Sequence, residues 1–250
     1  MRKYIEKFLA FLLDAVLPAL YRVEVKGLEK LEQINRDMPI IFAAQHPAMM
    51  DSVLLLRILW EKYKPRPVAD ENMYLIPVLR PFMWFVRAIP VPREQQTRER
   101  MHKILGTSAE ALKNKDSLLI FPAGHLMRSW KTVLGNLSGL WRLRKEFPEA
   151  HVVLVSVHGF WGSIFSTERH CGKTPNLFKV FFKVCFEVLA YVKKHKTCEL
   201  PKRKIRIEFE LASNLSEFPR QGYNDRKKLN SSVEKWFNRS EEFPNTDTVW

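Results

Sequence analysis

The sequence predicts an α/β domain with a mixed, largely parallel central sheet flanked by helices, and with an amphipathic helix at its N-terminus. Two observations support this fold class. Continuous apolar runs at 39–47, 118–124 and 152–159 are typical of short strands that are buried on both faces. Segments of helical length and periodicity separate these runs, and that alternation favours a layered sheet with helical crossovers.

The N-terminal segment, residues 1–22, has apolar residues at helical spacing and basic residues near both ends. Glu6 and Asp14 interrupt its apolar content. The segment therefore lacks the ~20 apolar residues of a membrane span and the unbroken core of a secretory signal. We predict a membrane-associating helix that lies in the plane of the bilayer interface. The alternative is an amphipathic helix that packs on its own domain.

Residues 23–223 are predicted to form the main domain, and 224–250 a C-terminal helix and polar tail. Alternation closed by Gly27 predicts a first strand at 21–26. The run at 39–47 is too short for a helix and has a proline at each end, which favours a buried strand. We expect a polar helical segment at 28–36 and further helices at 49–63, roughly 95–114, 174–197 and around 233–237. Further strands are expected at 118–124, 152–159 and 204–212. Residues 67–94 are expected to form a strand, a short helix and a second strand near 86–91.

The chain is strongly basic, with 41 Lys and Arg against 27 Asp and Glu and a formal net charge of +14. Such a surface attracts polyanions, and the candidate partners are nucleic acid, anionic lipid headgroups, and an acidic carrier or substrate. No zinc-ligand spacing, RNA-binding signature or helix-turn-helix pattern is present, so we expect no nucleic acid partner. Three cysteines without CxxC spacing indicate neither a disulfide framework nor a metal site, and fit a reducing compartment.

The segment that carries chemistry begins at His46, where the apolar part of the run at 39–47 ends, and continues to Asp51 in an H-x4-D pattern. On a regular helix these two side chains would point ~140° apart. They meet only if His46 lies in a loop and Asp51 in the first helical turn. Pro47 disfavours helical geometry at His46 and so supplies that break.

A carboxylate that accepts a hydrogen bond from one imidazole nitrogen leaves the other nitrogen as an acceptor and raises its basicity. His46 and Asp51 therefore predict a general base that takes a proton from an alcohol. The alternative is a helix-capping aspartate next to a surface histidine.

Together with three downstream segments, this pattern resembles the glycerolipid acyltransferase family, the type that includes bacterial lysophosphatidic acid acyltransferase. The family's second motif, a strand that ends in an arginine, looks like AIPVPR at 88–93. Its third motif, normally Phe-Pro-Glu-Gly, looks like FPAGH at 121–125, and its fourth is similar to VVLVSVHG at 152–159. Within the family, the chain looks most like the acyltransferase half of 2-acylglycerophosphoethanolamine acyltransferases.

The resemblance implies O-acyl transfer from acyl-CoA or acyl-carrier protein to a lysophospholipid or glycerol phosphate, in phospholipid synthesis or remodelling. It implies no further cofactor, and His46 and Asp51 are the implied catalytic pair. The implied substrate-binding residues are Arg93, Pro122, Gly124, His125 and Arg128. It also implies membrane association, monotopic or peripheral, at an anionic surface on the cytoplasmic face.

The third motif departs from the family at Ala123, where glutamate is usual. That glutamate is associated with acceptor binding, so the change bears on the acceptor's identity more than on the chemistry. His125 and Arg128 offer positive charge to a phosphate, unless they are solvated loop residues. A catalytically weak or silent lipid-binding relative is the alternative function.

A second amphipathic helix, predicted at 174–197, combines aromatic residues with basic residues that cluster from Lys193 to Lys204. Near an anionic leaflet such a cluster contributes up to ~1 kcal/mol per basic residue. Two interpretations remain open at this stage. The helix either faces a membrane or belongs to the core and has a solvated basic end.

Overall fold

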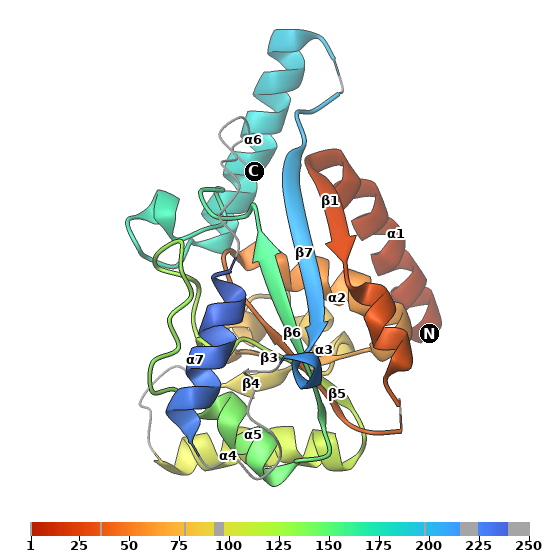
Figure 1. The fold of residues 1–250 in the computed structure, drawn as a ribbon. Coiled ribbons are helices and arrows are strands. Elements are labelled where there is room, and N and C mark those ends of the chain that lie inside the picture. The colour runs from red at the N-terminus through yellow and green to blue at the C-terminus, as the bar shows by residue number, and fades with distance from the viewer. Residues whose placement is uncertain are drawn as a thin grey trace.

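A seven-stranded sheet runs through the domain in the computed structural model (Figure 1). The structure describes residues 2–35, 37–77, 79–92, 98–197, 199–215 and 225–239. The strand order of the sheet is β1-β7-β6-β2-β5-β3-β4. Neighbouring strands are parallel except for β6 and β7, which confirms the mixed, largely parallel sheet. The strands are β1 (Tyr21–Lys26), β2 (Ile40–Ala44), β3 (Arg66–Asp70), β4 (Ile89–Val91), β5 (Ser117–Ile120), β6 (His151–His158) and β7 (Arg203–Leu211).

Both faces of the sheet are covered, as the unbroken apolar strands predict. Successive side chains of a strand point to opposite faces. In β2, Ile40 and Phe42 belong to one buried cluster, and Ile41 and Ala43 belong to the other. All five residues of β2 are buried, so this strand is the centre of the molecule.

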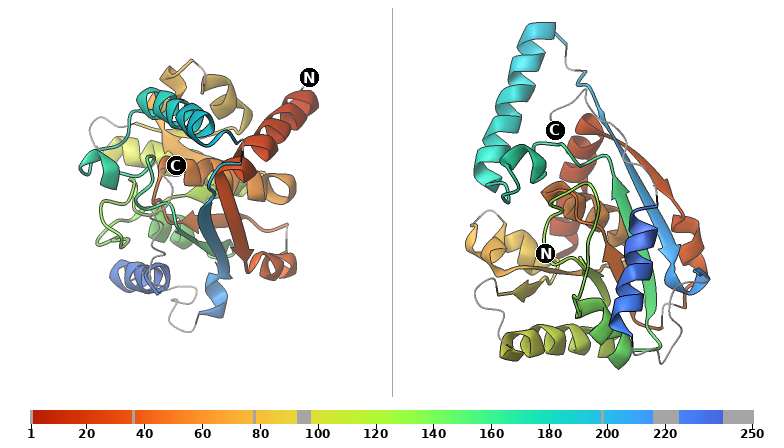
Figure 2. Two further views of the ribbon diagram at one scale, coloured as in Figure 1. Left: turned by 90° about the horizontal axis from the view of Figure 1, so that it is seen from above. Right: turned by 60° about the vertical axis from the view of Figure 1, so that its left-hand side comes forward.

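Helices form the two outer layers, and Figure 2 shows them on either side of the sheet. One layer contributes to the cluster around Phe42, and the other to the cluster around Ile41. The first layer contains α1 (Arg2–Leu20), α2 (Met49–Tyr63), α3 (Arg80–Phe85) and α6 (Leu177–His195). The second contains α4 (Arg98–Lys113), α5 (Gly139–Glu146) and α7 (Arg226–Phe237).

Three segments differ from the sequence-based expectation. The polar segment at 28–36 is a 3-10 helix, η1 (Leu28–Gln33). Helix α5 was not predicted, because only Leu140 and Leu143 among its eight residues are buried and so provide little periodicity. Helix α7 begins well before the predicted apolar part, since the side chain of Asp225 caps it by accepting a hydrogen bond from the Lys228 amide at 3.2 Å.

The N-terminal helix α1 packs on α2 through the two acidic residues that interrupt its apolar content. Asp14 accepts two hydrogen bonds from Arg57, both at 2.8 Å, and Glu6 accepts one from the Trp60 indole at 2.8 Å. Tyr4 and Phe11 of the same helix stay exposed. Helix α1 thus binds its own domain and leaves aromatic side chains uncovered. Among the described residues, no helix has the length and apolar content needed to cross a bilayer.

Candidate active site

The candidate site lies where the central strands end. Strands β2 and β5 are parallel neighbours, with Ala43 beside Ile120, so the segments that follow them leave the same edge of the sheet. His46 follows β2 and Phe121 follows β5. Their rings stack, with centroids 3.9 Å apart and planes 20° apart. The first and third predicted motifs are therefore in direct contact.

His46 and Asp51 form a hydrogen-bonded pair. Nδ1 of His46 lies 2.9 Å from Oδ1 and 3.1 Å from Oδ2 of Asp51. Ala48 is extended (φ −155°) and precedes α2, so His46 lies outside the helix and Asp51 in its first turn. This is the break in helical geometry that the five-residue spacing requires. The carboxylate of Asp51 is fully buried, whereas the His46 side chain keeps 18% of its surface exposed.

The surroundings of Asp51 hold its carboxylate in one orientation. The Ala48 amide donates to Oδ2 at 3.0 Å, and the Ser52 hydroxyl donates to Oδ1 at 3.2 Å. A buried carboxylate with this many donors remains an acceptor, so Nδ1 of His46 is the protonated ring nitrogen and Nε2 has the free lone pair. In the described part of the chain, no residue hydrogen-bonds to Nε2 of His46.

Gln45, which the sequence analysis did not single out, holds the backbone next to His46. Its side chain accepts from the Val157 amide at 3.1 Å and donates to the Thr132 hydroxyl at 3.0 Å and the Phe237 carbonyl at 3.3 Å. Gln45 thus ties the strand end to β6, to the loop after β5 and to α7. No periodicity marks it, because its partners are distant in sequence.

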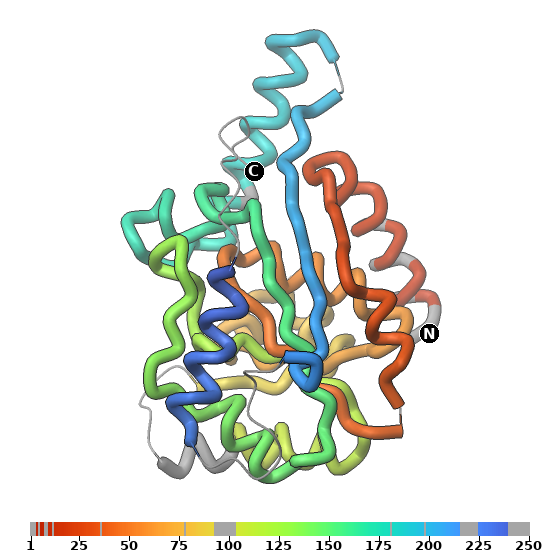
Figure 3. Tube along the Cα trace, in the orientation of Figure 1, coloured from red at the N-terminus to blue at the C-terminus, as the bar shows by residue number. Residues whose placement is uncertain are grey.

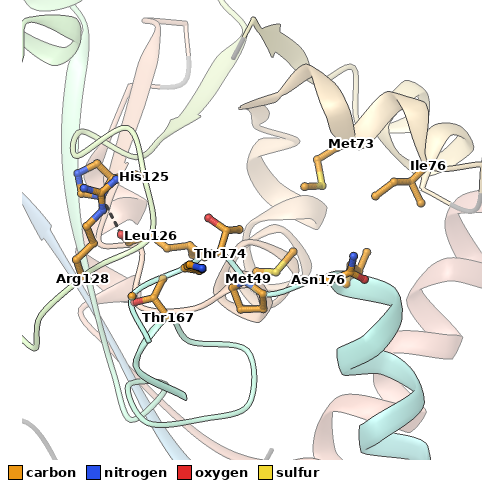
Figure 4. Close-up of a pocket in the computed structure, with 13 residues that line it drawn as sticks. Met49, Met73, Ile76, His125, Leu126, Arg128, Thr167, Thr174 and Asn176 are labelled. Atoms are coloured by element: carbon orange, nitrogen blue, oxygen red, sulfur yellow. Dashed lines mark hydrogen bonds between the residues drawn. The ribbon is translucent and has the colours of Figure 1, made fainter. Parts of the chain in front are cut away.

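A cavity of about 620 Å³ is lined by segments that adjoin the pair in the chain, although His46 and Asp51 themselves do not line it. Met49, in the turn between His46 and Asp51, lines it, and so does Leu126. The next residue, Met127, donates its amide to the His46 carbonyl at 2.8 Å. Figure 4 shows the cavity between the loop that carries His125 and Arg128, the segment with Met73 and Ile76, and the start of α6 at Asn176. The cavity is therefore built on the backbone that positions His46.

Of the five predicted substrate-binding residues, His125 and Arg128 line this cavity, whereas Pro122 and Gly124 do not. Nδ1 of His125 lies 2.7 Å from the Leu126 carbonyl oxygen, which orients the ring. Gly124 adopts a left-handed conformation (φ 70°) that turns the chain after β5. Arg93 lies outside the described residues.

A third basic residue, Lys173, lines the cavity together with Thr174 and Asn176. These residues belong to the segment before α6, which none of the sequence motifs includes. Together with His125 and Arg128, Lys173 gives the cavity a basic and hydrogen-bonding wall that suits an anionic group. Within the described ranges, no group of His, Cys, Asp and Glu is placed to hold a metal ion.

Ala123, the residue that departs from the family motif, does not line the cavity. It is 6% exposed and belongs to the buried cluster on the opposite face of the sheet from Phe42. A glutamate at this position would place a carboxylate among apolar side chains unless the turn moved. The turn therefore packs as part of the core.

Comparison with known proteins identifies a family and a similar fold. A family model described as Acyltransferase matches residues 22–159, more than half of the 250-residue chain. Among solved structures, the fold is similar to that of the 1-acyl-sn-glycerophosphate (LPA) acyltransferase PlsC from Thermotoga maritima, with a TM-score of 0.60 and 18% identity. The similarity covers 95% of this chain and 78% of that chain, and at this identity it shows the fold alone. No curated protein matches the sequence.

Proposed function

Since the chain belongs to the acyltransferase family, we propose that it transfers a fatty acyl chain from acyl-CoA or acyl-carrier protein to a hydroxyl of a lysophospholipid or glycerol phosphate. One observation carries the proposal. The imidazole of His46 is hydrogen-bonded through Nδ1, at 2.9 Å, to the fully buried carboxylate of Asp51. That arrangement leaves Nε2 as a base, and Met49, which lies between His46 and Asp51 in the chain, lines a cavity with a basic wall.

In the proposed reaction, Nε2 of His46 takes the proton of the acceptor hydroxyl. The acceptor oxygen attacks the carbonyl carbon of the thioester, and the carbon–sulfur bond breaks as the ester forms. The departing thiolate receives the proton from the imidazolium, which returns His46 to its starting state. Asp51 stabilises the imidazolium in between and keeps the ring in one tautomer.

The acceptor's phosphate is proposed to bind at the wall formed by His125, Arg128 and Lys173. Guanidinium and ammonium groups form charge-assisted hydrogen bonds with phosphate oxygens, and these are about twice as strong as neutral ones. All three residues line the cavity, and so does Met49, which begins the helix that carries Asp51. A phosphate bound at this wall is proposed to direct the attached glycerol toward His46. Arg93 is proposed to contribute to acceptor binding on the family pattern.

The proposed location is the cytoplasmic face of an anionic membrane, by monotopic or peripheral association. Helix α1 supports this, since Tyr4 and Phe11 are 80% and 72% exposed although the helix is docked on α2. The net charge of +14 favours anionic headgroups.

A catalytically silent lipid-binding relative is the second candidate, favoured by Ala123 in place of the usual glutamate. It retains the cavity and its cations but makes no ester. Binding of lysophospholipid without transfer from either donor would support this candidate. Detectable transfer to any acceptor would exclude it.

The deciding experiment measures transfer from labelled acyl-CoA and acyl-carrier protein to a panel of lysophospholipids and glycerol 3-phosphate. Wild type is compared with His46→Ala, which we expect to lose at least about 100-fold in rate, because general-base catalysis contributes that much or more. The panel also identifies the acceptor and the donor.

The matched control is His151→Ala, since His151 begins β6 at the opposite end of that strand from the site. Circular dichroism establishes that both variants are folded. A folded His46→Ala protein that transfers acyl chains at the wild-type rate would contradict the proposed mechanism.

A further inference from the structure

Helix α6 has an exposed apolar stripe. Its residues recur at spacings of four, four and three, so they occupy an arc of about 80° on one side of the helix. Each is large and apolar, and each is at least 48% exposed. They are Phe178 (48%), Phe182 (69%), Phe186 (71%) and Leu189 (68%).

The opposite side of α6 anchors the helix to the domain. Val180 is buried, and Val184 and Val188 pack against the same core cluster. The outer end of α6 extends beyond the body of the sheet, as the chain trace in Figure 3 shows. The stripe therefore lies on the outside of a helix that is already fixed in place.

Basic residues accompany the stripe. Glu187 is the one acidic residue in the sequence of α6. The lysines of α6 are all exposed, and so is Lys196, which follows the helix. Those within the helix are Lys179, Lys183, Lys193 and Lys194. An apolar face flanked by lysines matches an anionic lipid surface. The apolar side chains would contact the acyl chains, and the lysines would contact the anionic headgroups above them. A second copy of the chain in the same place would instead bring like charges together.

The stripe begins next to a residue that lines the cavity. Leu177 and Ile76 line the cavity, and their sequence neighbours Phe178 and Leu75 are 48% and 76% exposed. Trp84 of α3, 76% exposed, follows a few residues after Leu75. Both views in Figure 2 place α6 and the segment from η2 (Glu71–Leu75) to α3 on the same side of the molecule, and Figure 4 shows the cavity between them.

We propose that the α6 stripe and the exposed side chains of Leu75 and Trp84, here called the cavity rim, form one docking surface for an anionic bilayer, and that the lipid acceptor enters the cavity from the plane of the membrane. The proposal deepens the proposed function and rests on it, because it names the route by which a lipid reaches His46. It assigns lipid delivery to α6 and the cavity rim, and not to α1.

The experiment compares sedimentation of the full-length protein with vesicles of phosphatidylcholine and phosphatidylglycerol in equal amounts. The variant Phe186→Ser/Leu189→Ser removes two stripe residues that do not line the cavity. We expect its vesicle affinity to fall at least about tenfold, since both side chains lose apolar contact with the bilayer. The matched variant on α1 is Tyr4→Ser/Phe11→Ser, whose side chains are 80% and 72% exposed, and we expect a smaller loss.

Acyl transfer to a short-chain, water-soluble lysophosphatidate separates docking from chemistry. The α6 variant should keep this activity and lose transfer to long-chain acceptor embedded in vesicles. Vesicle affinity within twofold of wild type would overturn the proposal, as would a loss in the α1 variant equal to or larger than that in the α6 variant. Wild-type vesicle binding with no transfer to either acceptor would instead overturn the proposed function and leave the docking surface intact.

Discussion

Asp51 is the most constrained side chain of the candidate site. Its carboxylate is fully buried and accepts hydrogen bonds from the His46 ring, the Ala48 amide and the Ser52 hydroxyl. Burial of an unpaired carboxylate costs several kcal/mol, so these donors are what make the position stable. The same bonds leave His46 a single productive tautomer.

Replacing Asp51 by asparagine should reverse that tautomer. The Ala48 amide needs an acceptor, so the asparagine oxygen faces Ala48 and its NH₂ group faces Nδ1 of His46. Nδ1 then has to accept, and the proton moves to Nε2, where the base is needed. We expect kcat to fall roughly 100-fold to 10,000-fold with a small change in KM for the acceptor, measured by steady-state kinetics.

Ser52→Ala is the control for this change, because it removes one donor from Asp51 and leaves the carboxylate in place. A loss below about tenfold is expected, in line with one hydrogen bond. An Asp51→Asn enzyme with wild-type kcat would show that the carboxylate has no part in the reaction.

Among single residues, the sequence could identify those whose role is indicated by their neighbours in the chain. His46, Pro47 and Asp51 are close in sequence, and the proline marks the break that allows the pair to form. Gln45 and Lys173 are different, because their surroundings come from segments far away in the chain. The sequence also did not indicate that Ala123 is buried in the core, since its burial depends on how the turn after β5 packs.

At the scale of elements, the turn that ends β1 is held by a close approach of two backbones. Gly27 has φ 76°, and a Cβ atom added there would lie 2.1 Å from the Phe209 carbonyl oxygen of β7. Strand β1 pairs with β7 up to Lys26, directly before this glycine. The absence of a side chain at Gly27 is therefore required by the pairing of the edge strand.

Gly27→Ala should destabilise the protein more than positive φ alone explains. The strain of the left-handed conformation costs about 1–2 kcal/mol, and overpacking against a fixed backbone adds about 1–3 kcal/mol. Gly172→Ala is the matched control, since Gly172 has φ 77° and nothing within 4 Å of its Cβ position. Urea unfolding of both variants gives the difference. Equal losses in the two variants would contradict the close approach.

The predictability of an element depends on how its residues are buried. Helix α2 matches its predicted bounds of 49–63, because its apolar residues recur at helical spacing. Strand β2, Ile40–Ala44, is apolar throughout and lies within the predicted run at 39–47, but it ends three residues before that run does. Helix α5 has two buried residues, and its signal was too weak. Helix α7 depends on its cap at Asp225, which lies away from the apolar positions that indicated a helix.

At the scale of the whole molecule, stability should depend on pH through a buried histidine. His158 is 6% exposed, and no residue in the described ranges hydrogen-bonds to its Nε2 atom. Burial lowers the pKa of His158; Arg239 and Arg206 act in the same direction, while Glu208 opposes them. Burial also lowers the pKa of His151. The folded protein therefore keeps both side chains neutral at pH values where the unfolded chain begins to protonate them.

The unfolding free energy should consequently fall as the pH drops from about 7.5 to 5. Below an ordinary histidine pKa of ~6.5 the unfolded state binds more protons than the folded state, so acid favours unfolding. His158→Gln cannot take up that proton, and its stability should fall less steeply over the same range. Chemical denaturation at several pH values measures the slope of unfolding free energy against pH for wild type and for the variant. The slopes are compared, and not the unfolding free energies themselves, because the substitution also changes packing. Identical slopes would exclude His158 as a source of the dependence.

The sequence by itself determined the fold class, the order of the main elements and the pairing of His46 with Asp51. Each of these depends on local signals, namely apolar periodicity, a proline at a strand end and a spacing of five residues. The tertiary structure decided which segments meet at the site: the ring of Phe121 on His46, the link from Gln45 to α7, and Lys173 in the cavity wall. It also decided that Asp14 and Glu6 bind α2, and that Leu177, the neighbour of Phe178 in the α6 stripe, lines the cavity. These contacts join residues distant in the chain, and only the packing of the folded sheet brings such residues together.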